Sequence, residues 1–515
     1  MLLCAAPAGC YSVVGRSLQS GRMGLVGSRL LRLYSSPPGL DDDSFGEDTI
    51  YALSTSSPPS ALAIVRLSGP DSIPTLQKLT SPSFKVPPPR KMFLAKLFHP
   101  KSKVPLDEGM AVIFKGPKSF TGEDVVELHI HGSRGVVDGV IEAVSDSGLR
   151  AAERGEFTSR AFQNDKLSLL EVESLHSLLT SQTSTQRVLA LSTSSKVVAI
   201  YDSWRDVLIK AMSHTEAIID FSSDSDNTDL QEPELIYGGV LDSVKNLRKT
   251  MERHLEDGYK GELITNGVKV CLTGLPNAGK SSIINILAER DVSIVSSTPG
   301  TTRDVVTVQL DLGGVLCLVS DTAGLREGDD VDEVETEGVK RALRVREEAD
   351  VVVEVVGLDG IEEGGDGEEG DDIDLKVFNK ADLRDTEGNF DGGISISCVS
   401  GEGVDELISK LTKVVKDRVG NVGAGAGAGT EARAGENASE GSEDVIITKR
   451  RHREHVETAW EALCRFEVLA LEGEAAVDLA SEELRVASVE IGRIVGRVDV
   501  EDVLDSLFND FCVGK

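Results

Sequence analysis

The chain has 515 residues, of which 54 are Lys or Arg and 86 are Asp or Glu, so its formal net charge is −32. This length predicts roughly three domains, and a hydrophobic fraction of 40% excludes wholesale disorder. No run of about 18 apolar residues occurs, which excludes a membrane-spanning helix. Seven cysteines without a CxxC pair exclude a zinc ribbon and a disulfide scaffold. The acidity excludes a broad basic face for nucleic acid, so any nucleic-acid substrate needs a local basic site or a partner.

Residues 1–40 contain no Asp or Glu, whereas arginines and serines are spread among small apolar residues. Such a composition is typical of an organelle import sequence. We therefore expect residues 1–36 to be a transit peptide that directs the chain to the mitochondrion. A plastid transit peptide is the alternative.

Four short apolar segments with strand-like character follow, at 61–67, 92–97, 110–114 and 125–130. Helical periodicity begins near residue 160, with one apolar stripe at 167–179 and another at 204–212. From residue 268, apolar strands alternate with helical stretches, which predicts an α/β domain with a mainly parallel sheet. Helical periodicity returns at residue 445.

Two low-complexity segments interrupt this order. Residues 359–374 are rich in acids and glycine and contain no base, which predicts a solvated loop, and residues 420–444 are typical of a flexible linker. Because helical blocks lie on both sides of the α/β block, we expect the α/β block to be an inserted domain. The predicted limits are 46–163 for the β-rich domain, 164–265 and 445–515 for the two helical parts, and 266–419 for the insert.

The segment GLPNAGKSS at 274–282 lies between an apolar strand at 268–273 and a helical stretch at 283–290. It matches GxxxxGK[ST] in the strand–loop–helix context of a phosphate-binding loop. Its backbone N–H groups and the following helix N-terminus favour phosphate. Lys280 can reach the β and γ phosphates, and the Ser281 hydroxyl can bind Mg²⁺. DTAG at 321–324 places Asp321 where a Walker-B carboxylate approaches that ion, directly or through water.

The segment NKAD at 379–382 ends a further apolar strand. The Asp382 carboxylate can accept two hydrogen bonds from guanine that adenine cannot offer, and Ser397 and Cys398 would complete the base pocket. These motifs predict a Ras-like GTPase domain. The expected GTP contacts are Gly274, Asn277, Ala278, Gly279, Lys280, Ser281, Ser282, Thr301, Thr302, Asp321, Thr322, Ala323, Gly324, Asn379, Lys380, Asp382, Ser397 and Cys398.

Leu325 stands where GTPases of the Ras type carry the glutamine that orients the attacking water. An aliphatic side chain cannot do this, so hydrolysis needs another device. Asn277 and the oxygen-rich segment 296–304 could hold a monovalent cation near the phosphates, since oxygen ligands suit hard cations. The acidic run that ends at Glu335 could position water.

Further motifs lie outside the GTPase block, namely GPKSFTGED at 116–124, GEFTSRAF at 155–162, NDKL at 164–167 and FCVGK at 511–515. With them, the chain from about residue 48 to 515 resembles the MnmE (TrmE) family of tRNA-modification GTPases, in an organellar form. The resemblance implies a multidomain fold: a β-rich folate-binding dimerisation domain, a helical domain and an inserted GTPase domain. It also implies a homodimer that acts with a flavin-dependent partner of the GidA/MnmG type. Together they install a carboxymethylaminomethyl-like group at the wobble uridine, using a tetrahydrofolate.

The resemblance also implies roles for particular residues. Folate contacts are expected at Arg66, Glu127, Lys166 and Lys515. Potassium ligands are expected at Asn277, Ser296, Thr298 and Thr301, and Mg²⁺ ligands at Ser281 and Thr302. Catalytic roles are expected for Glu335, Lys280 and Cys512. The chain departs from the family pattern at 57–61, where a Gly-Arg/Lys-Gly turn is usual, and at Ser133, where a second glycine is usual.

Several interpretations stay open from the residues alone. His129 and His131 share a strand face and could bind a metal, although no third ligand is in register. Arg66 and Glu127 could be ordinary surface charges, and Cys512 could be a reactive thiol or a small buried side chain. A GTP-switched ribosome or RNA assembly factor is the alternative function, but such factors usually add a basic RNA-binding domain, and none is evident after residue 445.

Overall fold

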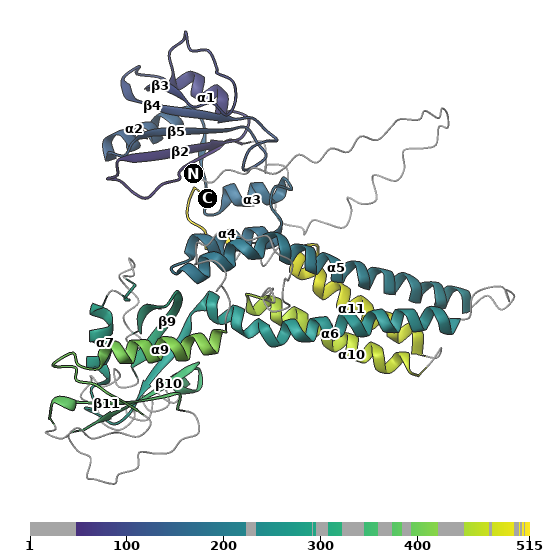
Figure 1. Ribbon diagram of the computed structural model, residues 1–515. Coiled ribbons are helices and arrows are strands. Elements are labelled where there is room, and N and C mark those ends of the chain that lie inside the picture. Colours follow the sequence, from purple (N-terminus) through teal and green to yellow (C-terminus); the bar gives the residue numbers. More distant parts are fainter. Residues whose placement is uncertain are drawn as a thin grey trace, which may run out of the picture.

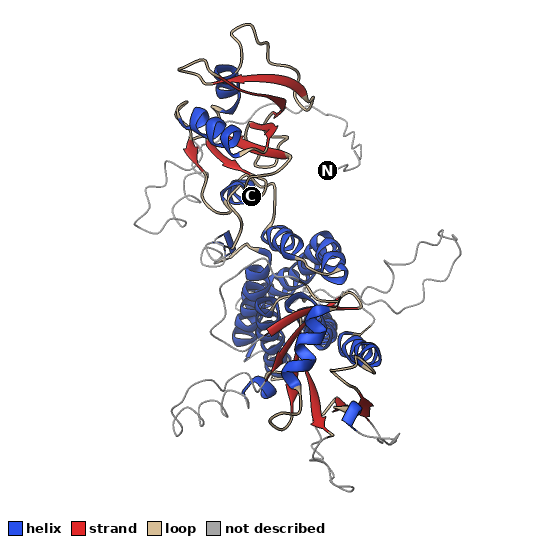
Figure 2. Cartoon of the chain, turned by 90° about the vertical axis from the view of Figure 1, so that its left-hand side faces the viewer, coloured by secondary structure: helices blue, strands red, loops and turns tan. Residues whose placement is uncertain are grey.

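The computed structural model describes residues 48–222, 233–290, 292–294, 307–321, 344–358, 373–383, 393–420, 447–472, 476–498, 504, 507–508 and 510–514 (Figure 1). The predicted transit peptide and most of the predicted acidic loop and linker lie outside these residues. No described helix is both long enough and apolar enough to cross a bilayer. In Figure 2 the two sheets lie apart, at opposite ends of the molecule.

The N-terminal unit, residues 48–163, is built on a six-stranded sheet in the order β3-β4-β5-β2-β1-β6. Its pairs are antiparallel except β1 with β6. The strands are β1 (Ile50–Leu53), β2 (Leu62–Ser68), β3 (Phe93–Phe98), β4 (Pro105–Phe114), β5 (Val125–His131) and β6 (Arg150–Ala151). Each of the four predicted strand segments overlaps an observed strand, which confirms the β-rich character of this unit.

Two helices that strand periodicity did not predict cover one face of this sheet. They are α1 (Ser72–Leu79) and α2 (Arg134–Ser145), and Leu76 and Val140 from them pack on Val65 and Leu67 of β2. The other face receives α3 (Glu156–Gln163), whose Phe157 packs on β1. Because side chains alternate along β2, Arg66 lies on the α3 side of the sheet.

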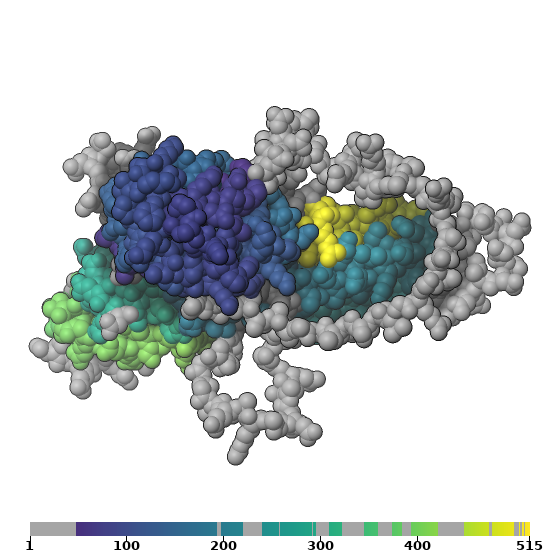
Figure 3. Space-filling model, turned by 90° about the horizontal axis from the view of Figure 1, so that it is seen from above, coloured from purple at the N-terminus to yellow at the C-terminus, as the bar shows by residue number. Residues whose placement is uncertain are grey.

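The helical unit comprises α4 (Leu169–Thr180), α5 (Ser184–Ser222), α6 (Pro233–Asn266), α10 (Arg450–Ala470) and α11 (Val477–Val495). The last four share one hydrophobic core, although α5 and α6 precede the α/β block in the sequence and α10 and α11 follow it. Figure 3 shows the yellow C-terminal helices beside the teal helices of the first part. A capping box of Ser168 and Glu171 begins α4. Leu179, predicted in the apolar stripe, is exposed because it lies in the last turn of α4.

The α/β unit, residues 267–420, has a six-stranded sheet in the order β12-β11-β10-β7-β9-β8, parallel except for the edge strand β8. The predicted mainly parallel sheet is confirmed. The strands are β7 (Val268–Thr273), β8 (Thr307–Leu312), β9 (Val315–Asp321), β10 (Val351–Gly357), β11 (Leu375–Asn379) and β12 (Gly393–Ser395). The helices are α7 (Lys280–Glu289), the short 3₁₀ helix η1 (Ala381–Leu383) and α9 (Val404–Val419).

The core of the α/β unit also contains residues of the helical unit. Leu189 from the first turns of α5 and Leu263 and Ile264 from the last turns of α6 pack among its strands. The main-chain N–H of Thr185 donates to the Gly314 carbonyl between β8 and β9 at 3.2 Å. The ends of α5 and α6 therefore belong to both units. The sheet is joined to the bundle by a packed hydrophobic interface and not by a flexible linker alone.

Candidate functional site

The phosphate-binding loop connects the end of β7 to the start of α7. Gly274 and Gly279 both have positive φ, at 137° and 96°. A side chain at Gly274 would collide with the Val355 carbonyl, and one at Gly279 with the Asn379 amide. Both glycines are therefore required by close backbone approach. The loop ends at the N-terminus of α7. Main-chain N–H groups at a helix N-terminus attract phosphate.

Lys280 and Ser281 stand in the first turn of α7. Lys280 is buried, and its Nζ donates to the carbonyls of Gly274 at 2.8 Å and Leu275 at 3.0 Å. The Ser281 hydroxyl donates to a carboxylate oxygen of Asp321, at the end of β9, at 2.5 Å. A hydroxyl and a carboxylate held together in this way form part of an oxygen ligand set that suits Mg²⁺. Ser281 of α7 and Asp321 of β9, both predicted to lie on the Mg²⁺ side of the site, are thus neighbours.

The predicted base pocket lies at the ends of β11 and β12. The Asn379 side-chain amide donates to the Ala278 carbonyl at 3.0 Å, which joins the base motif to the phosphate loop. One Asp382 carboxylate oxygen accepts from the buried Ser397 hydroxyl at 2.5 Å. Ser397 therefore orients the exposed carboxylate that the sequence assigns to guanine. Burial raises the pKa of the Cys398 thiol, so this thiol is mostly protonated at neutral pH.

Part of the predicted nucleotide and cation set lies outside the described residues. Asn277 is the described member of the potassium set, and its φ of 65° gives it a left-handed backbone at the centre of the loop. The members outside are Ser296, Thr298, Thr301, Thr302, Thr322, Ala323, Gly324 and Glu335, together with Leu325.

The α3 side of the N-terminal sheet carries an ion pair. Arg66 on β2 lies directly opposite Glu127 on β5, and its Nη2 contacts the carboxylate at 2.9 Å. The Arg66 guanidinium lies 5.6 Å from the centre of the Phe120 ring and 5.8 Å from that of Phe157. Both side chains of the pair are largely buried. The two aromatic rings were not singled out from the sequence, although both lie in the motifs at 116–124 and 155–162.

A buried ionic cluster lies beside this pair, and sequence reasoning missed it. Arg160 of α3 contacts Asp48 at 2.7 Å, Glu123 at 3.1 Å and Glu156 at 3.0 Å, while only 3% of its side chain is exposed. Glu123 also accepts from the Ser68 hydroxyl on β2 at 2.6 Å. The cluster therefore ties the loop at 116–124 to α3 and to the sheet.

The C-terminal segment returns to the N-terminal unit. Val513 forms a bridge with Arg154, and the Ser54 hydroxyl donates to the Gly514 carbonyl at 3.1 Å, directly after β1. Since β1 is the neighbour of β2, this segment docks one strand from Arg66; Figure 1 shows the C-terminus beside α3. Cys512 is exposed, whereas Lys515 lies outside the described residues.

The remaining predicted residues of this unit divide into two groups. Lys166 is exposed, and its side chain lies over Gly122 in the loop that carries Phe120. His129 lies 3.5 Å from Glu127, whereas His131 contacts Asp107 at 2.8 Å. The part of the chain that the structure describes contains no group of three metal-ligating side chains. The two histidines are therefore explained by separate carboxylate contacts.

Two family models match this chain. The model described as GTP-binding protein TrmE N-terminus matches residues 49–166, and the model described as MnmE helical domain matches residues 169–512. The chain belongs to the MnmE (TrmE) family of tRNA modification GTPases. It is accordingly a GTPase.

Individual relatives extend along nearly the whole chain. The chain is 42% identical to the tRNA modification GTPase MnmE of Parvibaculum lavamentivorans, over 91% of this chain and 100% of that protein. It is 39% identical to the mitochondrial 5-taurinomethyluridine-[tRNA] synthase subunit GTPB3 of Homo sapiens, over 91% of this chain and 93% of that protein. Among solved structures it is similar to the G domain of the T. maritima FeoB transporter, with 20% identity, 28% of this chain and 98% of that chain covered, and a TM-score of 0.21.

Proposed function

We propose that this chain is a potassium-activated GTPase that modifies the wobble uridine, position 34, of organellar tRNAs. It would act as a homodimer with a flavin-dependent partner of the GidA/MnmG type and install a carboxymethylaminomethyl-type group. The relatives named as a tRNA modification GTPase and as a mitochondrial 5-taurinomethyluridine-[tRNA] synthase subunit support this proposal. The acid-free residues 1–36 support import into an organelle, which we propose is the mitochondrion, with the plastid as the alternative.

The observation that carries the proposal is the docking of the C-terminal segment one strand from Arg66. It brings the chain end with Cys512 to the same unit as the Arg66–Glu127 pair and Lys166. Guanidinium and ammonium groups suit the carboxylates of a folate tail, and a carboxylate suits the N–H groups of a pterin. We therefore assign Arg66, Glu127, Lys166 and Lys515 to a 5-formyl- or methylene-tetrahydrofolate. The folate would supply the one-carbon unit when bound.

For GTP hydrolysis, the phosphate loop and Lys280 would hold the β and γ phosphates, and Ser281 and Thr302 would hold Mg²⁺. Leu325 cannot orient water, so we assign that role to Glu335. Asn277, Ser296, Thr298 and Thr301 would hold potassium, which would supply positive charge beside the phosphates. The unit limits given above from the sequence, 46–163, 164–265 with 445–515, and 266–419, are proposed as the domain limits.

The folate assignment is tested by Arg66→Ala. We expect this variant to lose 5-formyl-tetrahydrofolate binding in calorimetry and to fail to modify tRNA with the flavin partner, while GTP binding is unchanged, because the nucleotide loop lies in another unit. Lys96→Ala, in an exposed ion pair on the same sheet, is the matched control. Modified nucleosides are measured by mass spectrometry of position 34. A wild-type chain that binds no folate and modifies no tRNA would favour the assembly-factor alternative.

A further inference from the structure

The first turn of α10 joins three other helices, and its side chains have no part in the sites described above. We call Arg451, His452 and Arg453 the basic turn. It opens the second helical part of the chain, just after the α/β unit and the linker in sequence. Arg451 and His452 contact α4, Arg451 also contacts α11, and Arg453 contacts α6.

Arg453 connects the basic turn to the segment of α6 that belongs to the GTPase core. Its Nε donates to Glu262 at 2.8 Å, and Glu262 is buried. One turn before Glu262, the Tyr259 hydroxyl donates to Asp350 at 2.6 Å. The other Asp350 oxygen accepts from the main-chain N–H of Lys269 at 2.8 Å, at the start of the strand that leads to the phosphate loop. Glu262 is thus carried by the same helix turns that are bonded to the GTPase sheet.

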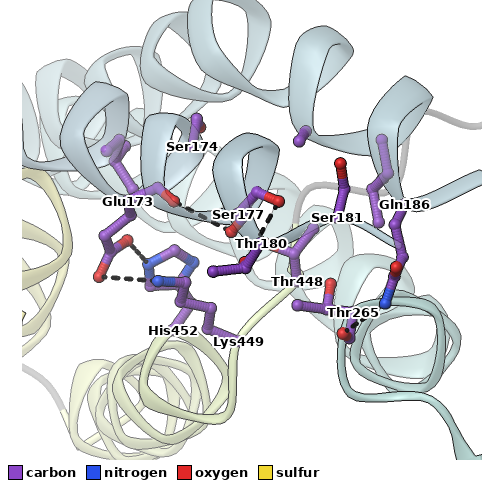
Figure 4. Close-up of a pocket in the computed structure, with 13 residues that line it drawn as sticks. Glu173, Ser174, Ser177, Thr180, Ser181, Gln186, Thr265, Thr448, Lys449 and His452 are labelled. Carbon is purple, nitrogen blue, oxygen red and sulfur yellow. Dashed lines mark hydrogen bonds and ion pairs between the residues drawn. The ribbon is translucent and has the colours of Figure 1, made fainter. Parts of the chain in front are cut away.

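His452 and Arg451 connect the basic turn to α4. His452 Nε2 donates to one oxygen of Glu173 at 2.7 Å (Figure 4). Arg451 Nη2 donates to the other oxygen at 2.9 Å. Glu173 and His452 are both buried. Burial opposes the ionisation of Glu173, but His452, Lys449 and Arg451 outweigh it and hold its pKa well below the usual range. The Glu173 carboxylate is therefore ionised at neutral pH and accepts one hydrogen bond from His452 and one from Arg451.

The C-terminal segment packs on the turns of α4 next to this contact. His176, one turn after Glu173, has its ring 5.1 Å from that of Phe511. Phe511 packs in a small core with Leu169 and Val172 of α4. Cys512 follows directly, and Gly514 is bonded to Ser54. A displacement of α4 therefore acts on the segment that carries Cys512.

A small cavity lies where the basic turn meets the ends of α5 and α6. It has a volume of about 60 Å³ and is lined mainly by polar side chains, among them Glu173, Gln186, Thr265 and His452 (Figure 4). The Nδ1 atom of His452 is buried and has no hydrogen-bond partner. A polar void here leaves the basic turn room to shift against α5 and α6, which a close-packed core would not.

We propose that the basic turn couples the GTPase unit to the C-terminal segment, through Arg453–Glu262 on one side and His452–Glu173 on the other. The four side chains are positioning residues for tRNA modification, so this inference rests on the proposed function. They are not required for GTP hydrolysis, because none contacts the nucleotide loop. These contacts form a continuous path between the GTPase unit and the C-terminal segment. Only a measured coupling between the two shows that a change in one is transmitted to the other.

The test follows the reactivity of Cys512 in the full-length chain. A small thiol reagent is applied in GDP and in GDP with aluminium fluoride and potassium, and peptide mass spectrometry reports the labelling rate of Cys512 alone. For wild type we expect the two rates to differ at least about fivefold, a typical allosteric effect. Arg453→Gln and Glu262→Gln should make the two rates equal while GTP turnover stays within about twofold of wild type.

Arg450→Gln is the matched control, because Arg450 lies in the same turn but is exposed, and its ion pair among the described residues is with Glu454 of α10 itself. The control should keep the wild-type difference, and the exchange Glu262→Arg with Arg453→Glu should restore it. Equal rates in wild type, or a difference that survives Arg453→Gln, would overturn the coupling. A wild-type chain that shows the difference but modifies no tRNA would instead overturn the proposed function.

Discussion

At the scale of single residues, the GTP site depends on side chains that orient one another. Ser397 holds one oxygen of Asp382, and Asn379 bonds the phosphate loop through the Ala278 carbonyl. The base pocket and the phosphate loop are therefore one connected structure before nucleotide enters. Such preorganisation reduces the cost of ordering these groups on binding.

Asp382→Asn should weaken GTP and improve the binding of xanthosine triphosphate. The change replaces an acceptor of guanine N–H groups by an amide that can donate to xanthine, and each charged hydrogen bond lost typically costs about 1.5–3 kcal/mol. Calorimetric titration with both nucleotides measures the effect. Asp405→Asn, the same chemical change at an exposed carboxylate of α9, should alter neither affinity. Equal weakening of both nucleotides by Asp382→Asn would contradict the guanine assignment.

At the scale of elements, α3 is attached to the N-terminal sheet by charge as well as by packing. Arg160 serves three carboxylates, and no described residue of this helix other than Phe157 and Ala161 contributes a fully buried apolar side chain. Burial opposes the ionisation of Asp48 and Glu156, but their bonds to Arg150 and Arg160 outweigh it, so the pKa of both carboxyls is lowered. Lowered values mean that the cluster stabilises the fold when its carboxylates are charged.

Arg160→Ala should therefore destabilise the chain by about 3 kcal/mol at neutral pH, because the largely buried Glu123 loses its ion pair while Asp48 and Glu156 keep only Arg150. The wild-type advantage should be complete above about pH 5 and should shrink as the pH falls through the lowered carboxyl values. Urea unfolding of both proteins between about pH 7 and pH 3.5 measures this difference. Arg134→Ala, which removes only an exposed pair on α2, should change little at any pH.

At the scale of the whole molecule, the described GTPase sheet is built into the helical bundle rather than tethered to it. Leu189, Leu263 and Ile264 lie in the GTPase core, while more central residues of the same two helices lie in the bundle core. Because α5 and α6 are continuous helices that enter both cores, a rearrangement of the sheet is expected to move both helices. In the homodimer proposed above, we expect two such GTPase units to meet face to face.

Hydrolysis should be fast in potassium and slow in sodium at equal ionic strength, with GTPase units pairing only in potassium and a transition-state mimic. Preorganised charge of this kind is typically worth about 10²–10³ in rate. Phosphate release and small-angle scattering measure the two effects. Asn277→Ala should remove the potassium response, whereas Glu335→Ala should abolish turnover but keep GTP binding and pairing. Equal turnover in the two salts at saturating GTP would refute the cation mechanism.

The sequence by itself determined the features that depend on short stretches of chain. The strand Val268–Thr273 was predicted at the bounds that the structure has, whereas the helix after the loop begins at Lys280 rather than at the predicted residue 283. The alternation in β2 predicted a strand with one buried face. Such patterns are readable because strand and helix periods are local properties, and because a phosphate loop needs its glycines and Lys280 within a few residues.

Only the tertiary structure decided which distant residues meet. Arg66 lies opposite Glu127, 61 residues away, through the register of β2 and β5. The Ser54 hydroxyl donates to the Gly514 carbonyl across 460 residues, and Arg160 donates to Asp48 across 112 residues. The helices α1 and α2 were missed for a related reason. Their apolar stripes are short, and they can be recognised as buried faces only once the sheet that they cover is known. A periodic pattern states which face of an element is buried, but the surface that buries it comes from elsewhere in the chain.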